Sequence, residues 1–594
     1  MKPSSIVVSF LVTVCAVRAG QPLNVVLVMT DDQGYPDIAY HGNPIIQTPN
    51  MDKLAASSIQ FSDFHVNPFC SPTRAALMTG RMSDRSGVTS TNTHRNYMRR
   101  NEVVMAEFFK ASGYRTGIFG KWHLGANYPY RPIDRGFDEW LGLGNNGLAT
   151  CQDHWDNDRM HDTYWHNGKP EKREGFDVDV YFEAAMAFIK DARRRGQPFF
   201  SYIATNVPHW DWNVPADWLK PYEATCSRER AAFYASINRV DHNLGRLMAF
   251  LDKEGLADNT ILVFLTDNGS DVPDKSQDAY TAGMRGFKGA RYEGGHRVPC
   301  FFRAPESLVG KSRVIDGLTA HLDLLPTFID YCGLKSPDRE LLPFDGRSLK
   351  PLLSGDGTWG ERMIVYHHHN GQPLKKNTRA VVLTPEWRMI QEKPGGKTEL
   401  YRIREDRAQE RNVAEEYPET VTALKAKYDA HWKALDTRDI MERPIMAKGQ
   451  EMRLTPDITN AGNPITQQAI RQGRPITPVW LLEVPADGRY RFEVRRWPRG
   501  VEAAMSDPIP PTTDPDIEYI GHKTYRIDVP GVALDVAKVE LTLSGRATEK
   551  PVKKDAASVT FDVDLPKGNV DVEAWLISSD GKRQGAYFVY ARQM

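Results

Sequence analysis

The sequence has no excess of charge of either sign, no internal repeat and few cysteines. Its 76 basic and 76 acidic residues cancel, so we expect neither nucleic acid nor an anionic membrane as the main partner. Beyond Ala19, no apolar run approaches the roughly 20 residues that a membrane-spanning helix needs. The remaining composition, 41% hydrophobic and 26% charged over 594 residues, is that of a water-soluble globular protein with several domains.

Residues 1–19 have the pattern of a signal peptide. Lys2 supplies a positive charge, Ile6 to Val17 form a short apolar segment, and Val17-Arg18-Ala19 is an acceptable cleavage site. A buried N-terminal strand is the alternative interpretation. We therefore expect an exported protein, secreted or periplasmic.

Removal of the signal peptide, which contains Cys15, leaves an odd number of cysteines. An odd count in an exported protein indicates one thiol with a special role. If Cys70 has that role, the other four form disulfides in one of three pairings or stay free. The five cysteines are Cys70, Cys151, Cys226, Cys300 and Cys332.

The first half of the chain alternates apolar runs with amphipathic stretches. The runs 24–30, 198–204 and 260–266, with a shorter one at 114–119, are continuous, which is typical of strands buried on both faces of a parallel sheet. Apolar residues at helical spacing occupy 178–193 and 230–252. This alternation predicts an α/β domain over 20–345, with helices on both faces of a mostly parallel sheet.

The second half changes character. Residues 346–440 predict a small α+β subdomain, with a strand at 396–402 and a helix at 418–435, and 441–475 lack periodicity and are interpreted as a linker. Short strands separated by turns follow and predict a β-sandwich-like accessory domain over 476–594. Its expected strands are 479–484, 489–494, 538–545, 558–565, 570–578 and 585–591.

Oxygen-bearing side chains follow two of the predicted parallel strands. Asp31 and Asp32 end the first strand, and Asp267 and Asn268 end the run 260–266. Parallel strands deliver such residues to one edge of the sheet. Crowded carboxylates need a cation, and oxygen ligands suit Ca²⁺ or Mg²⁺. Each pair taken alone is equally well explained as the cap of a helix or turn.

Cys70 is followed by a helix signature. Ser71 is a good N-cap, Pro72 a good first residue and Gly80 a good terminator, so we expect Cys70 just ahead of a helix N-terminus. Backbone N–H groups favour an anion at that place, and Arg74 adds a positive charge. A reactive thiolate and a buried structural cysteine are both consistent with this pattern.

The segment CSPTRAALMTGR at 70–81 contains C-x-P-x-R and resembles the signature of the sulfatase family, within the alkaline phosphatase superfamily. Five further segments resemble family motifs in family order, and 399–414 is similar to the segment that often follows them. The resemblance covers roughly 22–440 and implies an alkaline-phosphatase-like fold. The five segments are DDQG (31–34), GKWHLG (120–125), PH (208–209), TDNG (266–269) and FKGARYEGGHRVP (287–299).

The resemblance also implies a mechanism. A formylglycine-generating enzyme would oxidise Cys70, and the hydrated aldehyde would ligate one Ca²⁺ together with Asp31, Asp32, Asp267 and Asn268, and attack sulfur. Arg74 and Lys121 would hold the diol and the sulfate. His209 and Lys288 would face the leaving oxygen, and one of them would donate its proton. His123 would take the second diol proton and expel sulfate.

The substrate is less defined by the sequence. Seven ring-bearing residues near the predicted strands suit sugar rings, so we expect a sulfated glycan or a small sulfate ester, although packing explains the rings equally well. They are His154, Trp155, Tyr164, Trp165, Trp210, Trp212 and Trp218. The alternatives are a phosphonate or phosphodiester hydrolase and a non-catalytic protein that binds sulfated glycans. The tract His367-His368-His369 has the composition of a metal-binding tract but is interpreted as an exposed loop near the mouth of the substrate site.

Overall fold

The computed structural model describes residues 21–594, except for 92–94, 145, 276–277, 356, 358, 368–372, 437–440, 460 and 522–524. A ten-stranded sheet forms the centre of the N-terminal part of the chain. Its strands, in spatial order, are β11 (Arg313–Ile315), β2 (Ile59–Phe61), β10 (Cys300–Arg303), β9 (Thr260–Thr266), β1 (Asn24–Asp31), β8 (Phe199–Pro208), β4 (Arg115–Gly120), β5 (Glu139–Gly142), β6 (Thr163–His166) and β7 (Lys169–Lys172).

The middle of this sheet is parallel, which confirms the predicted fold class. β1 pairs with β8 and β9, β8 pairs with β4, and β4 pairs with β5, all in parallel. Every residue of β1, β8 and β9 is buried. These strands are the continuous apolar runs of the sequence, because both of their faces lie under helices.

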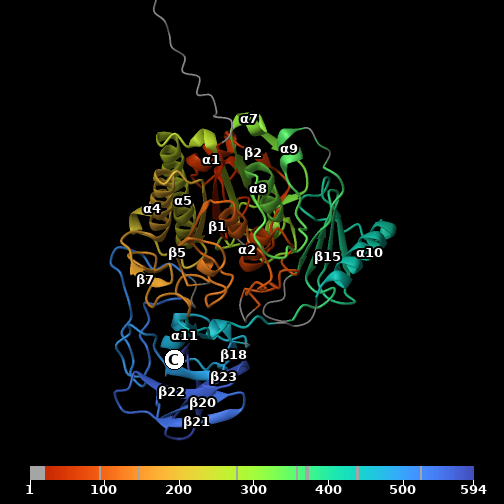
Figure 1. Ribbon diagram of the computed structural model, residues 1–594. Coiled ribbons are helices and arrows are strands. Elements are labelled where there is room, and N and C mark those ends of the chain that lie inside the picture. The colour runs from red at the N-terminus through yellow and green to blue at the C-terminus, as the bar shows by residue number, and fades with distance from the viewer. Residues whose placement is uncertain are drawn as a thin grey trace, which may run out of the picture.

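Alternate side chains of β1 point into two separate cores. Val26 and Val28 pack with α4 (Asp177–Arg194) and α5 (Arg228–Lys253). Leu27 and Met29 pack on the other face with α2 (Cys70–Thr79), α3 (Met105–Ala111) and α8 (Leu324–Cys332). Figure 1 shows α4 and α5 on one side of β1, and α2 and α8 on the other. The carboxyl ends of the central strands lie between these layers.

A four-stranded antiparallel sheet follows the ten-stranded sheet in the chain. It consists of β13 (Ile364–His367), β14 (Ala380–Leu383), β15 (Trp387–Gln391) and β16 (Thr398–Arg402), and α10 (Pro418–Ala434) packs on it. Arg388 of β15 donates hydrogen bonds to Glu293 and Asp63, and all three residues are buried. This network joins the small sheet to the main one.

The C-terminal region contains two further antiparallel sheets, which share one apolar core. The first has the order β17 (Glu451–Leu454), β25 (Phe588–Gln593), β19 (Gly488–Arg495) and β22 (Ser558–Leu565). The second has the order β18 (Val479–Val484), β23 (Gly568–Ile577), β20 (Lys538–Leu543) and β21 (Arg546–Pro551), with β24 (Arg583–Gly585) beside β23.

The stretch expected to be a linker is partly regular. β17 lies within it and pairs with β25, and α11 (Gln467–Arg471) follows. β17 is only four residues long, too short to give a periodic signal, and its strand character depends on a partner near the C-terminus. The domain boundaries drawn from the sequence stay predictions.

The predicted signal peptide lies outside the described residues. Within the described part, no helix is long and apolar enough to cross a membrane. Cys70, Cys151, Cys226, Cys300 and Cys332 are all free thiols.

Candidate active site

The ten residues given catalytic or metal-binding roles from the sequence lie in one cluster at the carboxyl ends of the central strands. Contacts among their side chains and backbone connect all of them, and all except Lys288 are buried. They are Asp31, Asp32, Cys70, Arg74, Lys121, His123, His209, Asp267, Asn268 and Lys288.

The oxygen donors meet because β1 and β9 are neighbours. Thr30 pairs with Thr266, so the residues after them emerge side by side. The Asp32 N–H donates to Asp267 Oδ1 at 3.1 Å, and Asn268 Nδ2 donates to Asp32 Oδ1 at 2.9 Å. Asp32 has a φ of 73°, in the left-handed region, which turns the chain sharply after the strand.

Three cations each pair with a carboxylate of the cluster. Lys121, just after β4, lies with Nζ 2.6 Å from Asp31 Oδ2. Arg74 of α2 donates two hydrogen bonds to Asp267 Oδ2, at 2.8 and 3.2 Å. Lys288 binds Asp32 Oδ2. These pairs are desolvated, so the loss of one partner would leave a buried uncompensated charge.

Cys70 itself is the first residue of α2. The expected N-cap at Ser71 is wrong: the helix begins two residues before the predicted start at Pro72, Phe69 occupies the cap position, and no side chain caps it. Gly80 ends the helix with a φ of 66°, as predicted. The Cys70 Sγ lies 3.3 Å from His123 Nδ1, and His123 Nε2 donates to the Thr91 carbonyl at 2.8 Å.

Burial raises the pKa of the Cys70 thiol to about 11, and the carboxylates of Asp31 and Asp267 add to the rise against the effect of Lys121. The side chain is therefore a neutral thiol at neutral pH, which argues against the reactive-thiolate interpretation. Burial and the nearby Lys121 hold the pKa of His123 well below its usual value. A neutral His123 has an acceptor at Nδ1, which faces position 70.

The donor set fits a hard divalent cation. Asp31 Oδ1 and Asn268 Oδ1 are buried without a hydrogen-bond partner among the described residues. Asp31, Cys70 and Asp267 each offer an atom within 4.8 Å of the others. Burial and the charge of Asp31 raise the pKa of Asp267 to about 8, so the two carboxyls share a proton unless a cation lies between them. Oxygen ligands of this kind suit Ca²⁺ or Mg²⁺.

The proposed leaving-group side has further residues that the sequence reasoning did not assign. Trp210 Nε1 donates to Asp271 Oδ2 at 2.6 Å, and Asp271 Oδ2 lies 3.5 Å from Lys288 Nζ. Asn206 is fully buried, and neither polar atom of its amide has a partner among the described residues. Neither Trp210 nor Asp271 lies in a family motif: Trp210 was considered only among the ring-bearing residues that suit sugar rings, and the sole available signal for Asp271 is its place two residues after TDNG.

The histidine tract is not an exposed loop at its first residue. His367 ends β13 with 2% of its surface exposed, because its ring packs against α10. His367 Nδ1 and His431 Nε2 each lie 2.9 Å from the same oxygen of Asp84. Two imidazoles on one carboxylate oxygen form a hydrogen-bonded bridge between α10 and the segment after α2. His368 and His369 lie outside the described residues.

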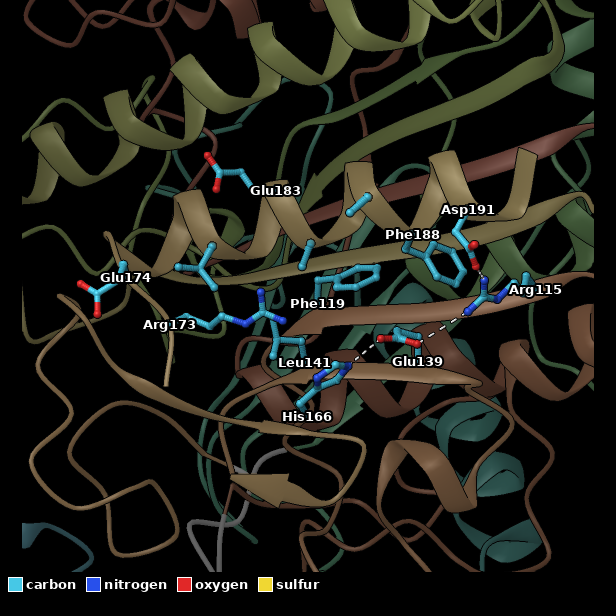
Figure 2. A pocket seen from close by; sticks show the side chains of 13 residues that line it. Arg115, Phe119, Glu139, Leu141, His166, Arg173, Glu174, Glu183, Phe188 and Asp191 are labelled. Atoms are coloured by element: carbon cyan, nitrogen blue, oxygen red, sulfur yellow. Dashed lines mark hydrogen bonds and ion pairs between the residues drawn. The ribbon is translucent and has the colours of Figure 1, made fainter. Parts of the chain in front are cut away.

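A cavity of about 560 Å³ opens on another part of the surface, between α4 and the strands β4 to β6 (Figure 2). Several of its charged lining residues pair with one another: Arg115 with Asp191 and Glu139, and His166 with Glu139. It shares no residue with the Cys70 cluster. The chemistry predicted from the sequence therefore lies elsewhere.

Comparison with known proteins identifies the class that this fold and site define. Residues 23–334 match the family model of the sulfatases, and residues 286–433 match that of the C-terminal region of N-sulphoglucosamine sulphohydrolase. The first match spans more than half of the chain. The chain belongs to the sulfatase family.

Individual relatives agree with this assignment. The N-acetylgalactosamine-6-sulfatase of Canis lupus familiaris is 31% identical over 59% of this chain and 70% of that enzyme. Arylsulfatase A of Homo sapiens is 31% identical over 58% of this chain and 71% of that enzyme. The crystal structure of Ps i-CgsB in complex with k-i-k-neocarrahexaose matches with a TM-score of 0.63 and 27% identity over 71% of this chain and 95% of that one. The protein is a sulfatase, an enzyme that hydrolyses sulfate esters.

Proposed function

We propose that this enzyme removes sulfate from a carbohydrate, with formylglycine made from Cys70 as the nucleophile and one Ca²⁺ beside it. The observation that carries the proposal is the position of Cys70. It is the first residue of α2, 3.3 Å from His123 and grouped with Asp31 and Asp267. A neutral buried thiol is a poor nucleophile, whereas a hydrated aldehyde at this place would lie among acceptors and cations.

The ion would be held by Asp31, Asp32, Asp267, Asn268 and position 70. When bound, Ca²⁺ supplies a Lewis acid that stabilises negative charge on the sulfate oxygens. Arg74 and Lys121 flank the same place from α2 and β4, and they orient the carboxylates through their ion pairs. Their charges favour the anionic sulfate group of the ester in a region that excludes water.

Two residues would serve the leaving oxygen. Asp32 and Asp271 hold the pKa of Lys288 well above its usual value although partial desolvation opposes its charge, so Lys288 keeps its proton. Burial lowers the pKa of His209 to about 4, and its Nδ1–H donates to the Trp210 carbonyl at 2.7 Å. The neutral ring therefore faces Asp32 with an unprotonated Nε2, 3.8 Å from Oδ2. A bound sulfate ester adds negative charge there and favours protonation of His209, which can then donate to the leaving oxygen.

His123 is suited to the last step. Its Nε2–H is fixed by the Thr91 carbonyl, so Nδ1 can accept a proton from a hydroxyl at position 70. Loss of that proton would regenerate the aldehyde and release sulfate without water attacking sulfur.

A carbohydrate substrate is supported by the relatives. Ps i-CgsB was crystallised with k-i-k-neocarrahexaose, and the relative from dog is named for N-acetylgalactosamine-6-sulfate hydrolysis. The ring of Trp210 stacks beside His209 with centroids 5.4 Å apart. We further propose that the protein is exported, to the periplasm or the medium, and that a formylglycine-generating enzyme acts on Cys70 during maturation.

The test is turnover of defined sulfated oligosaccharides by enzyme that carries formylglycine, with Cys70→Ala as the control. Sulfate release from at least one oligosaccharide, absent in Cys70→Ala, is expected. Equal turnover by the control would refute the nucleophile. A parallel comparison of aryl sulfates with aryl phosphodiesters separates the phosphodiesterase alternative, because faster phosphodiester cleavage would contradict the proposal.

A further inference from the structure

The C-terminal region reaches the catalytic cluster through one long connection. Residues 496–537 join β19 to β20, and the described part of this connection, which we call the arm, contains no helix or strand. In Figure 1 it runs as a blue loop from the C-terminal sheets up beside β7. A connection of this length between consecutive strands of one domain is unusual unless it has its own role.

The arm binds the segment that directly follows His209. The Trp212 N–H donates to the Ile520 carbonyl at 2.7 Å, and the Glu518 N–H donates to the Val214 carbonyl at 2.9 Å. Gly521 lies so close to Asp211 that an added Cβ would be 2.4 Å from its carboxylate. Backbone hydrogen bonds therefore hold the arm against the segment 211–214.

A second contact fixes the other side of the same site. Ile527 of the arm is buried against Leu148 and Ala149. The preceding residue, Gly147, lies against Asn206 and His209, since a Cβ there would be 3.4 and 3.9 Å from their side chains. The arm thus supports both loops that border His209.

Tyr525 makes the contact closest to the chemistry. It is 8% exposed and packs edge-on against Trp210, with ring centroids 4.6 Å apart and planes at 82°. Trp210 stacks on His209, accepts the His209 Nδ1–H through its carbonyl, and donates its indole N–H to Asp271. Asp271 in turn lies beside Lys288. Trp210 is thus connected to both residues of the leaving-group side.

We propose that Tyr525 is a positioning residue for the leaving-group side of the active site, so that the C-terminal β-region is a functional part of the catalytic unit. The inference rests on the proposed function of His209 and Lys288. Edge-to-face packing holds the Trp210 ring, and the ring holds His209 and, through Asp271, Lys288. Without Tyr525 the indole can rotate into the space left behind. His209 and Lys288 are then misplaced for donating a proton to the leaving oxygen, while the residues that would hold Ca²⁺ keep their positions.

The consequence is a dependence on the leaving group. A sugar alkoxide is a poor leaving group and needs a proton from a general acid, whereas 4-nitrophenolate departs without one. We expect Tyr525→Ala to lower kcat for a sulfated oligosaccharide by about 10–100-fold, a part of the ~10²–10⁴ that a general acid contributes. For 4-nitrophenyl sulfate we expect less than about a 3-fold change, with KM for both substrates similar to wild type.

Three variants make the test specific. Tyr525→Phe keeps the ring edge and should restore most of the oligosaccharide activity. Tyr525→Leu fills the space without an aromatic edge and should show the same selective loss of oligosaccharide activity as Tyr525→Ala. It also keeps the test valid if the alanine variant folds poorly. Tyr519→Phe removes the arm's hydroxyl contact to Asp158, away from Trp210, and should leave the ratio of the two activities unchanged.

His209→Ala separates this inference from the function on which it rests. If His209→Ala loses oligosaccharide activity selectively but Tyr525→Ala and Tyr525→Leu lower both substrates equally, or neither, the role of Tyr525 is refuted and the proposed function stands. If His209→Ala itself shows no selectivity between the substrates, the proposed role of the leaving-group side is refuted.

Discussion

Arg74 is the cation whose removal should separate stability from catalysis most clearly. It is 1% exposed, donates two hydrogen bonds to Asp267 and one to the Lys121 carbonyl, and lies 3.8 Å from Asp31. Burial opposes its charge, but Asp267 holds the pKa of the guanidinium above its usual value. Arg74→Met keeps much of the side-chain volume and removes all of these interactions.

Arg74→Met should lower both the free energy of unfolding and kcat. Breaking a buried ion pair on one side costs ~3–5 kcal/mol, because the remaining charge has no partner. Asp267 and Asp31 would then repel one another, so the variant should depend more strongly on added Ca²⁺ for stability. In catalysis, removal of one preorganised charge beside a developing anion costs ~10²–10³-fold in kcat.

Arg388→Met is the matched control. Arg388 is equally buried and is paired with Glu293 and Asp63 at 2.7 and 2.9 Å, but it lies in the network that joins the four-stranded sheet (β13 to β16) to the ten-stranded sheet. Urea unfolding should show a similar loss of stability for both variants. Turnover of 4-nitrophenyl sulfate, measured where both remain folded, should collapse only for Arg74→Met. Equal turnover by the two variants would refute the role of Arg74.

The remaining predictions concern the thiol, the cation, one histidine and one glycine. Cys70→Ala should unfold at nearly the wild-type temperature in a calorimeter yet release no sulfate. Protein freed of Ca²⁺ by a chelator should release about one proton for each Ca²⁺ that it binds at pH 6, because the pKa of Asp267 is about 8 without the ion. Calorimetric titration in two buffers of different ionisation enthalpy measures the number of protons released. Binding without proton release would contradict the proton shared by Asp31 and Asp267. Burial lowers the pKa of His41 to about 4 in the folded protein. The neutral ring therefore contributes to the free energy of unfolding above about pH 6.5, and this contribution is lost as the pH falls towards 4. In His41→Asn, the slope of the free energy of urea unfolding against pH should decrease in this range by up to about 1.4 kcal/mol per pH unit. Gly120 has a φ of 113°, and a Cβ there would be 1.9 Å from the Ala204 carbonyl, so Gly120→Ala should lower the unfolding temperature markedly, and an unchanged value would be inconsistent with this packing.

The central sheet and the catalytic cluster could be predicted from the sequence because their signals are local. The runs at 24–30 and 260–266 are strands buried on both faces, so their apolar character is continuous, and β1 and β9 begin and end within one residue of the prediction. Once these strands are parallel neighbours, Asp31, Asp32, Asp267 and Asn268 must meet at one edge.

What could not be predicted depends on contacts between distant segments. Strand β17 is defined by β25, and the burial of His367 is defined by α10 and Asp84. The contact between Tyr525 and Trp210 could not be predicted, because neither residue lies in a motif or in a periodic apolar pattern. An edge-to-face contact of two rings does not restrict the neighbouring residues in the sequence. The start of α2 at Cys70 rather than after Ser71 follows from packing of the whole first turn, which overrides the preference of Ser71 for the cap position.

The most direct test of the account is the covalent state of residue 70. Enzyme prepared with different degrees of maturation can be digested, and the fraction of the 70–81 peptide that carries formylglycine instead of cysteine measured by mass spectrometry beside kcat. The account predicts that kcat for sulfate release is proportional to the formylglycine fraction and falls to the level of Cys70→Ala when that fraction is zero. Full activity in protein whose residue 70 is entirely cysteine would contradict it.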